Sequence, residues 1–209
     1  MDRIKTLLLV GGKIHDFKGC GQVIEDILRA DGRFDVIKVE EDLSALETVK
    51  ITPYDLLVFY YTVGEISDAQ LNGLSHFIAQ GKGFVGIHSA ADSFRDSPDY
   101  RAFIGGYFVT HPRFRQYQVS IVDPEHPITK DMVEFTVEDE QYILDYDSRV
   151  NILCSALWRG KAMPVAWTKP WGKGRVFYLA LGHNPEACRQ EGFRILLTRG
   201  AFWAGKPAE

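Results

Sequence analysis

The sequence predicts an α/β protein with a doubly wound, mostly parallel sheet and an antiparallel addition in its C-terminal part. Three observations support this fold class. Apolar runs alternate with one-sided helical patterns over the first two-thirds of the chain, a Gly-Lys-Gly turn leads from one such helix directly into a strand, and the last third is rich in strands with few helices between them. Strands separated by helices of this length form right-handed crossovers, which place the strands parallel to one another.

The first strand–helix–strand unit begins near the N-terminus. Leu7–Val10 is a continuous apolar run followed by two glycines, which indicates a strand covered on both faces. A helix with one apolar face follows and ends near Gly32, and Phe34–Val39 alternates between apolar and polar residues as a second strand. Asp55–Tyr61 is apolar after its first residue, so we expect another buried strand there.

The next helix has clear start and stop signals. Ser67 is a good N-cap, and the apolar residues that follow it fall on one helical face. Gly81-Lys82-Gly83 ends this helix, and Phe84–Ile87 begins another strand at once. A connection this short leaves no room for another element.

The C-terminal part contains strands with few helices between them. The predicted strands are Gln116–Asp123, Val150–Ala156, Met163–Thr168 and Arg175–Leu181. Trp171–Gly174 is a turn sequence, so we expect the last two strands to form a hairpin, and a closing helix ends near Gly205. In open α/β sheets, ligands bind outside the carboxyl ends of the strands, where we therefore expect the functional site.

Composition excludes several classes of protein. The chain has 209 residues, of which 45% are hydrophobic and 25% charged, and it contains no repeat or linker-like stretch, so residues 1–209 are predicted to form a single domain. The net charge of −4 argues against nucleic acid as a partner. No apolar run approaches the roughly 20 residues that span a bilayer, so we expect no membrane association.

Targeting signals and cysteines point to one compartment. The apolar stretch near the N-terminus ends at Val10 and is too short for a signal peptide. Cys20, Cys154 and Cys188 are far apart in the sequence and fit neither a zinc-binding spacing nor a disulfide framework. We therefore expect a cytoplasmic protein.

Several histidines fall at or near strand ends. His15 lies in the loop after the first strand, and His88 and His183 end later strands. His111 lies in the segment that follows the helix after His88. Because the carboxyl ends of neighbouring parallel strands share one edge of a sheet, we expect these four side chains to approach one another across a single cleft.

The segment Gly86–Ala90 has the pattern of a nucleophile elbow, in which a strand turns sharply into a helix and exposes one residue between small neighbours. The exposed residue here is His88. An imidazole at a helix N-terminus is held towards its neutral form by the helix dipole, and a neutral imidazole can bind a metal or accept a proton.

A series of short motifs runs along the chain. They are Gly11-Gly12 with His15, GIHSA (86–90), GGYFVTHP (105–112), DPEHPI (123–128), DEQY (139–142), PVAW (164–167), GKGRVFYLALGH (172–183) and FWAG (202–205). In this order, over almost the whole chain, the sequence resembles the ThuA-like (trehalose utilisation) family. The resemblance implies a flavodoxin-like fold of the class I glutamine amidotransferase-like type, with residues 1–209 as one ThuA-like domain.

The sequence departs from the amidotransferase pattern at the catalytic positions. Those enzymes have a cysteine at the elbow, where this chain has His88, so no glutamyl thioester can form there and glutaminase activity is excluded. His183 matches the triad histidine, but Glu186 comes one position later than the carboxylate of that pattern. Cys20 and Cys188 do not lie at the elbow and are interpreted as buried structural cysteines.

The family resemblance implies a role in carbohydrate catabolism, with a glycoside or an oxidised (keto) sugar as the small-molecule substrate. Acid–base chemistry by histidine and carboxylate suits a sugar isomerase, lyase, hydratase or hydrolase. The candidate catalytic residues are His88, His183 and Glu140, and the candidate substrate-binding residues are His15, His111, Tyr61 and Trp167. The Asp139-Glu140 segment is equally compatible with a solvated acidic turn.

A divalent metal, zinc or manganese, is a further candidate cofactor. His15, His88, His111 and His183, with Glu140 in addition, could supply its ligands, although no short HxH or HExxH motif accompanies them. The alternative function is a non-catalytic sugar- or metabolite-binding module on the same fold, which burial of His88 or His183 against backbone carbonyls would favour. A homo-oligomer is compatible with the sequence.

Overall fold

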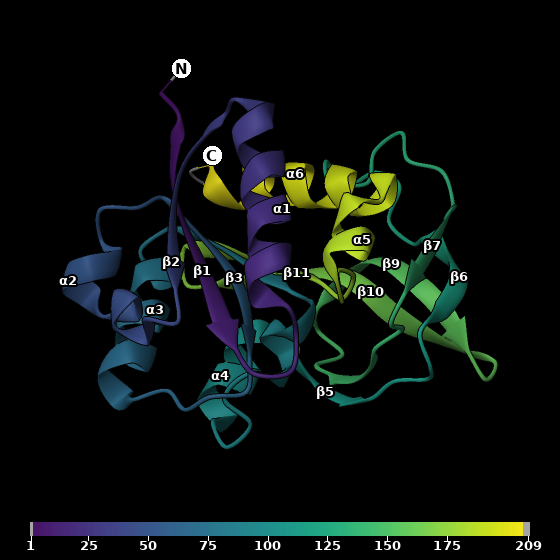
Figure 1. Ribbon diagram of the computed structural model, residues 1–209, viewed down its shortest axis with the longest axis horizontal. Coiled ribbons are helices and arrows are strands. Elements are labelled where there is room, and N and C mark those ends of the chain that lie inside the picture. The colour runs from purple at the N-terminus through teal and green to yellow at the C-terminus, as the bar shows by residue number, and fades with distance from the viewer. Residues whose placement is uncertain (1, 207–209) are drawn as a thin grey trace.

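A mixed sheet of nine strands forms the centre of the computed structural model, which describes residues 2–206. Its strand order is β2-β1-β3-β4-β11-β10-β9-β6-β7 (Figure 1). The strands are β1 (Ile4–Gly12), β2 (Phe34–Glu40), β3 (Leu56–Thr62), β4 (Gly83–Ile87), β6 (Arg115–Ile121), β7 (Phe135–Asp139), β9 (Asn151–Trp158), β10 (Lys161–Trp171) and β11 (Gly174–Leu179). A separate antiparallel pair consists of β5 (Gly106–Thr110) and β8 (Ile143–Tyr146).

The sheet has a parallel half and an antiparallel half, which confirms the predicted fold class. β2, β1, β3, β4 and β11 are parallel neighbours. β10, β9, β6 and β7 continue the sheet with antiparallel pairing. The predicted hairpin is formed by β10 and β11, whose residues Trp171 and Gly174 pair across the turn.

Helices cover both faces of the parallel half. They are α1 (Phe17–Asp31), α2 (Thr48–Ile51), α3 (Asp68–Ala79), α4 (Pro98–Ile104), α5 (Pro185–Arg189) and α6 (Glu191–Gly205), with 3₁₀ turns η1 (Leu43–Leu46) and η2 (His88–Asp92). Residues of α1, α5 and α6 join the apolar core on one face, and residues of α2, α3 and α4 join the core on the other. Figure 1 shows α1 and α6 over the same part of the sheet. Within residues 2–206, no helix has the length and apolar character to cross a membrane.

Capping side chains set the helix boundaries that the sequence predicts. Asp16 accepts a hydrogen bond from the Gly19 amide at the start of α1, and Gly32 ends that helix in the left-handed conformation. At the start of α3, Ser67 and Gln70 form a capping box. These caps act between residues a few positions apart, so they can be recognised in the sequence.

The carboxyl ends of the parallel strands meet at one edge of the sheet. His15 follows β1, Thr62 ends β3, His88 follows β4 and His183 lies just beyond β11. The antiparallel strand β7 brings Glu140, the residue after its last position, to the same edge. The two halves of the sheet therefore both supply side chains there.

Candidate metal centre

Three imidazoles and one carboxylate form a cluster at this edge, which we call the histidine–glutamate cluster (His15, His88, His183 and Glu140). One nitrogen atom of each histidine and one oxygen atom of Glu140 all lie within 4.8 Å of one another. The ring centroid of His15 is 5.0 Å from that of His88 and 5.1 Å from that of His183. The four residues are therefore close enough to act on one bound ion or one reacting group.

His88 is held at a strained position at the start of η2, directly after β4. Its φ angle is +43°, which a residue with a side chain adopts rarely and which is typical of the predicted elbow. The side chain is fully buried, and its Nδ1 atom lies 2.7 Å from the carbonyl oxygen of Ala180. Because Nδ1–H donates to this carbonyl, the lone pair is on Nε2, a buried atom for which the described residues provide no hydrogen-bond partner.

His15 is oriented in a similar way. Its Nδ1 atom lies 2.8 Å from the hydroxyl oxygen of Thr62, the last residue of β3. Burial, together with the neighbouring imidazoles of His88 and His183, lowers the pKa of His15 to about 3. The ring is therefore neutral at physiological pH, the form in which histidine binds a metal.

Glu140 connects the histidines. Its Oε2 atom lies 3.0 Å from His183 Nδ1 and 3.7 Å from His88 Nε2. His183 Nδ1 is buried and, despite this short distance, is not aligned for a hydrogen bond with any described residue. Burial raises the pKa of Glu140, but the close approach of His183 and His88 outweighs it and holds the pKa well below its ordinary value. The carboxylate is ionised, and the same contact raises the pKa of His183.

Asp139 has a structural role beside the cluster. Its buried carboxylate accepts hydrogen bonds from the backbone amides of Gly182 at 2.7 Å, His183 at 3.1 Å and Glu140 at 2.7 Å. These bonds join the end of β7 to the loop after β11. Asp139 and Glu140 thus do not form a solvated acidic turn; both are buried at the site.

His111 lies at the rim of the cluster, outside the group of four. Its Nδ1 atom is 3.0 Å from Glu140 Oε1 and 2.8 Å from the carbonyl oxygen of Pro112, and 40% of its side chain is exposed. One carboxylate oxygen therefore faces the buried histidines and the other faces His111. The structure brings all four predicted histidines together, but it separates His111 from the inner group.

Two predicted substrate-binding residues lie elsewhere. Tyr61 points away from the cluster into the other apolar core, where its ring stacks on Phe59. Trp167 is fully buried and donates a hydrogen bond from Nε1 to the carbonyl oxygen of Ile104, so it has no surface to offer a ligand. Consecutive strand residues point to opposite faces, and it is Tyr60 that reaches the site: its hydroxyl donates to the Gly182 carbonyl oxygen at 3.0 Å.

Phe114 is a neighbour of the cluster that no sequence pattern predicts. Its ring centroid is 5.8 Å from that of His183, and 40% of the residue is exposed. Large exposed apolar side chains beside polar groups are common at ligand sites, but nothing in the local sequence distinguishes Phe114 from a core phenylalanine. Glu186, the displaced counterpart of the amidotransferase carboxylate, is 77% exposed and lies near Arg189, so Glu140 takes its place beside His183.

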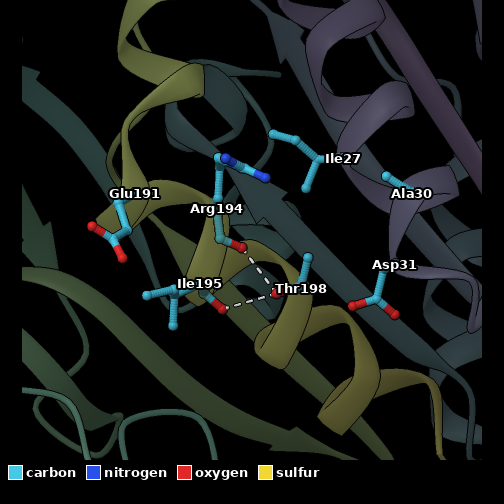
Figure 2. A pocket seen from close by; sticks show the side chains of 7 residues that line it. All are labelled: Ile27, Ala30, Asp31, Glu191, Arg194, Ile195 and Thr198. Atoms are coloured by element: carbon cyan, nitrogen blue, oxygen red, sulfur yellow. Dashed lines mark hydrogen bonds between the residues drawn. The ribbon is translucent and has the colours of Figure 1, made fainter.

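A cavity of about 370 Å³ lies away from the cluster, between α1 and α6 (Figure 2). Figure 2 shows Ile27, Ala30 and Asp31 on one side and four residues of α6 on the other. The hydroxyl of Thr198 on α6 donates to the carbonyl oxygen of Arg194. No histidine or cysteine lines this cavity, so the chemistry-bearing residues remain those at the carboxyl edge.

Fold and site together define an α/β protein with a histidine–carboxylate cluster at the carboxyl edge of its parallel strands. Residues 5–204 match the ThuA family, described as trehalose utilisation. The chain belongs to this family. No match is found among curated proteins.

Several solved structures share the fold of this chain. A ThuA-like protein from Parabacteroides merdae has 24% sequence identity and a TM-score of 0.90, over 98% of this chain and 91% of that one. A ThuA-like protein from Bacteroides uniformis has 21% identity and a TM-score of 0.81, over 98% and 91% of the two chains. A protein from Salmonella typhimurium, described as cytoplasmic, has 14% identity and a TM-score of 0.71, over 97% and 100%.

Proposed function

We propose that this protein is a metal-dependent enzyme of carbohydrate metabolism that acts on a glycoside or an oxidised (keto) sugar in the cytoplasm. The observation that carries the proposal is a pair of buried ring nitrogens, His88 Nε2 and His183 Nδ1, that have no hydrogen-bond partner among the described residues and lie beside the same Glu140 oxygen. Leaving a buried polar atom unpaired costs about 1–3 kcal/mol, which a bound cation would offset.

The donor set fits a divalent transition metal. His15, His88, His183 and Glu140 offer three imidazole nitrogens and one carboxylate oxygen, ligands that suit zinc and also manganese. The other ring nitrogens of His15 and His88 are engaged by Thr62 and Ala180, the outer-shell arrangement that fixes the tautomer of a metal-binding histidine. A metal bound here supplies Lewis acidity to a sugar hydroxyl or carbonyl oxygen.

The surrounding residues supply proton transfer and sugar contact. His111 donates from Nδ1 towards Pro112 and Glu140, so its Nε2 is free to accept a proton from a substrate. The exposed ring of Phe114 offers an apolar face beside His183, and aromatic faces pack well on sugar rings. The family's description, trehalose utilisation, agrees with a sugar substrate.

A non-catalytic sugar-binding module is the second candidate function. The observation in its favour is the complete burial of His88, whose Nδ1 atom bonds to the Ala180 carbonyl as in a structural histidine. The unpaired Nε2 atom on the other side of the ring weighs against it, because a purely structural histidine satisfies both nitrogens.

Metal content and turnover together test the proposal. Protein purified without a His-tag is analysed for bound metal, with about one zinc or manganese per chain as the expected result. His88→Asn and His183→Asn should lose the metal, whereas His76→Asn, at an exposed position on α3 that is not part of the cluster, should retain it. Wild type is then incubated with glycosides and keto sugars with and without chelator. If metal-free protein takes up neither zinc nor manganese, the proposed metal centre is wrong. If wild type binds a sugar without turnover, the result supports the binding module.

A further inference from the structure

A second cavity lies at the opposite edge of the sheet from the histidine–glutamate cluster. Its volume is about 310 Å³, and its walls come from Arg149 and the start of β9, the end of β10, the β10–β11 turn, the start of β11 and the end of α6. His183 lies beyond the carboxyl end of β11, whereas Arg175 is near its amino end. At about 3.3 Å per residue, the length of β11 separates the two places by roughly 20 Å. This cavity is therefore independent of the proposed function.

Four cationic residues line this cavity, and no acidic residue among residues 2–206 does. They are Arg149, Lys169, Lys173 and Arg175. A grouping of this kind is unexpected in a chain with a net charge of −4, because like charges repel one another unless a counter-charge lies between them.

Nearby carboxylates neutralise only part of this charge. Asp147 lies 2.7 Å from Arg149 and 3.9 Å from Lys169. Asp123 accepts a hydrogen bond from Asn151, a polar residue of the wall, at 3.0 Å. Lys173 and Arg175 have no ion-pair partner among residues 2–206. Lys173 and Arg175 thus bring two positive charges to this cavity that no ion pair among residues 2–206 offsets.

Two contacts with Trp203 fix the orientation of the Arg175 side chain. Its Nη1 atom donates a hydrogen bond to the carbonyl oxygen of Trp203 at 2.9 Å, and its guanidinium carbon lies 5.1 Å from the centroid of the Trp203 ring. An arginine fixed by its own backbone and aromatic contacts loses little conformational freedom when it binds an anion. Trp203, which is half-buried, also places an indole in the wall of the cavity.

We propose that this cavity binds the phosphate group of a small phosphorylated metabolite. A phosphate monoester carries close to two negative charges at neutral pH and matches the two positive charges of Lys173 and Arg175, whereas a carboxylate carries only one. Its three terminal oxygens can accept hydrogen bonds from guanidinium and ammonium groups at the same time. A volume of about 310 Å³ suits a small molecule rather than a polymer.

Binding of inorganic phosphate and of glycerol phosphate tests the proposal, with glycerol as the neutral control. Titrations are followed by calorimetry and by tryptophan fluorescence, because Trp203 lies in the wall. Wild type should bind both phosphates saturably and should not bind glycerol. Lys173→Gln should weaken the affinity roughly tenfold, the loss expected for one charge-assisted hydrogen bond, and Lys173→Arg should restore most of it.

Two control variants test whether phosphate binding depends on the cations of this cavity. Lys161→Gln removes the same charge from an exposed position at the start of β10, outside the cavity, and should bind phosphate as wild type does. His88→Asn removes a ligand of the proposed metal centre and should also leave phosphate binding unchanged. Three results would overturn the proposal. The first is an equal loss of phosphate affinity in Lys173→Gln and Lys161→Gln, and the second is a loss of phosphate binding in His88→Asn alone. The third is the absence of saturable phosphate binding by wild type. Lys173 is exposed in a turn, so its variants should keep the fold, which thermal melting checks.

Discussion

His88 Nε2 lies 3.7 Å from Glu140 Oε2, although the two residues follow strands in different halves of the sheet. His88 follows the parallel strand β4, and Glu140 follows the antiparallel edge strand β7. An ion bound between them would connect both halves of the sheet. Occupancy of the site should therefore affect the stability of the whole molecule.

Metal removal should lower the thermal midpoint. With free metal at 100 times its Kd, binding stabilises the folded state by about 2.7 kcal/mol. For a chain of this size each kcal/mol corresponds to about 2–4 °C, so chelation should lower Tm by about 5–10 °C. The midpoint is measured with chelator and after adding back zinc or manganese. His183→Asn is the control, and its Tm should not change when metal is added. A wild-type Tm that is likewise unchanged by zinc and by manganese contradicts the prediction.

Thr62→Val should weaken metal binding while leaving all four proposed ligands in place. The Thr62 hydroxyl lies 2.8 Å from His15 Nδ1 and orients that ring, and removal of such an outer-shell partner costs roughly 10–100-fold in metal affinity. Zinc affinity is measured by competition with a chelating dye. Thr6→Val is the matched control, because Thr6 is also fully buried but its hydroxyl bonds to Ile4. Equal affinities of the two variants would show that Thr62 has no orienting role.

His88→Cys should not produce glutaminase activity, although it places a thiol at the elbow. A thiolate there can be reactive, but hydrolysis also needs an oriented histidine, an oxyanion hole and a pocket for glutamine. The carboxylate beside His183 is Glu140, which also lies near His88 and His111, so the amidotransferase arrangement is absent. Ammonia release from glutamine is measured for wild type and variant. Turnover by the variant alone would indicate a recently inactivated amidotransferase.

Glu25→Gln should reduce stability at neutral pH but not in acid. Glu25 on α1 lies 3.0 Å from Lys38 on β2 and 2.9 Å from Arg29. Burial raises the pKa of Glu25, but the hydrogen bonds and charges of these two cations outweigh it, so the pKa is below its ordinary value of 4.5. A lowered carboxyl pKa stabilises the fold above the unfolded-state value, and this contribution disappears as the pH falls through the folded-state value.

The expected loss is at most about 1 kcal/mol at pH 7, as for other ion pairs near the surface. It is measured by urea unfolding at pH 7 and at pH 3, where wild type and variant should converge. Glu186→Gln is the control, because its side chain is 77% exposed and lies 3.6 Å from Arg189. A difference between Glu25→Gln and wild type that persists at pH 3 would indicate lost packing instead of lost charge.

The approach of His15, His88 and His183 could be predicted from the sequence, because each follows a strand whose apolar run is recognisable locally. Parallel strands joined by short helical crossovers end at one edge of the sheet, which places His15 and His88 there. His183 reaches the same edge because β11, the second strand of a hairpin with β10, runs parallel to β4. The same pattern locates the elbow at His88, where the structure has a positive φ angle.

The partner of these histidines could not be predicted in this way. Glu140 follows β7, and the position of β7 in the sheet depends on pairing with β6, which no local pattern specifies. The segment that ends in Tyr60 and Tyr61 is apolar on both faces, so its sequence does not show which tyrosine faces the site. The burial of Trp167 could not be predicted for a similar reason, since an aromatic residue in a strand suits a core and a binding surface equally well.

The sequence by itself thus determined most of the strands, though not β5, β7 and β8, and the edge of the sheet where three histidines gather. These features follow from hydrophobic periodicity, caps and turns, which act between residues a few positions apart. Only the tertiary structure decided that Glu140 faces His88 and His183, that His111 lies at the rim, and that four cations share a cavity at the opposite edge. Those contacts join distant segments, and their geometry depends on how the antiparallel strands and the helices pack against the parallel half.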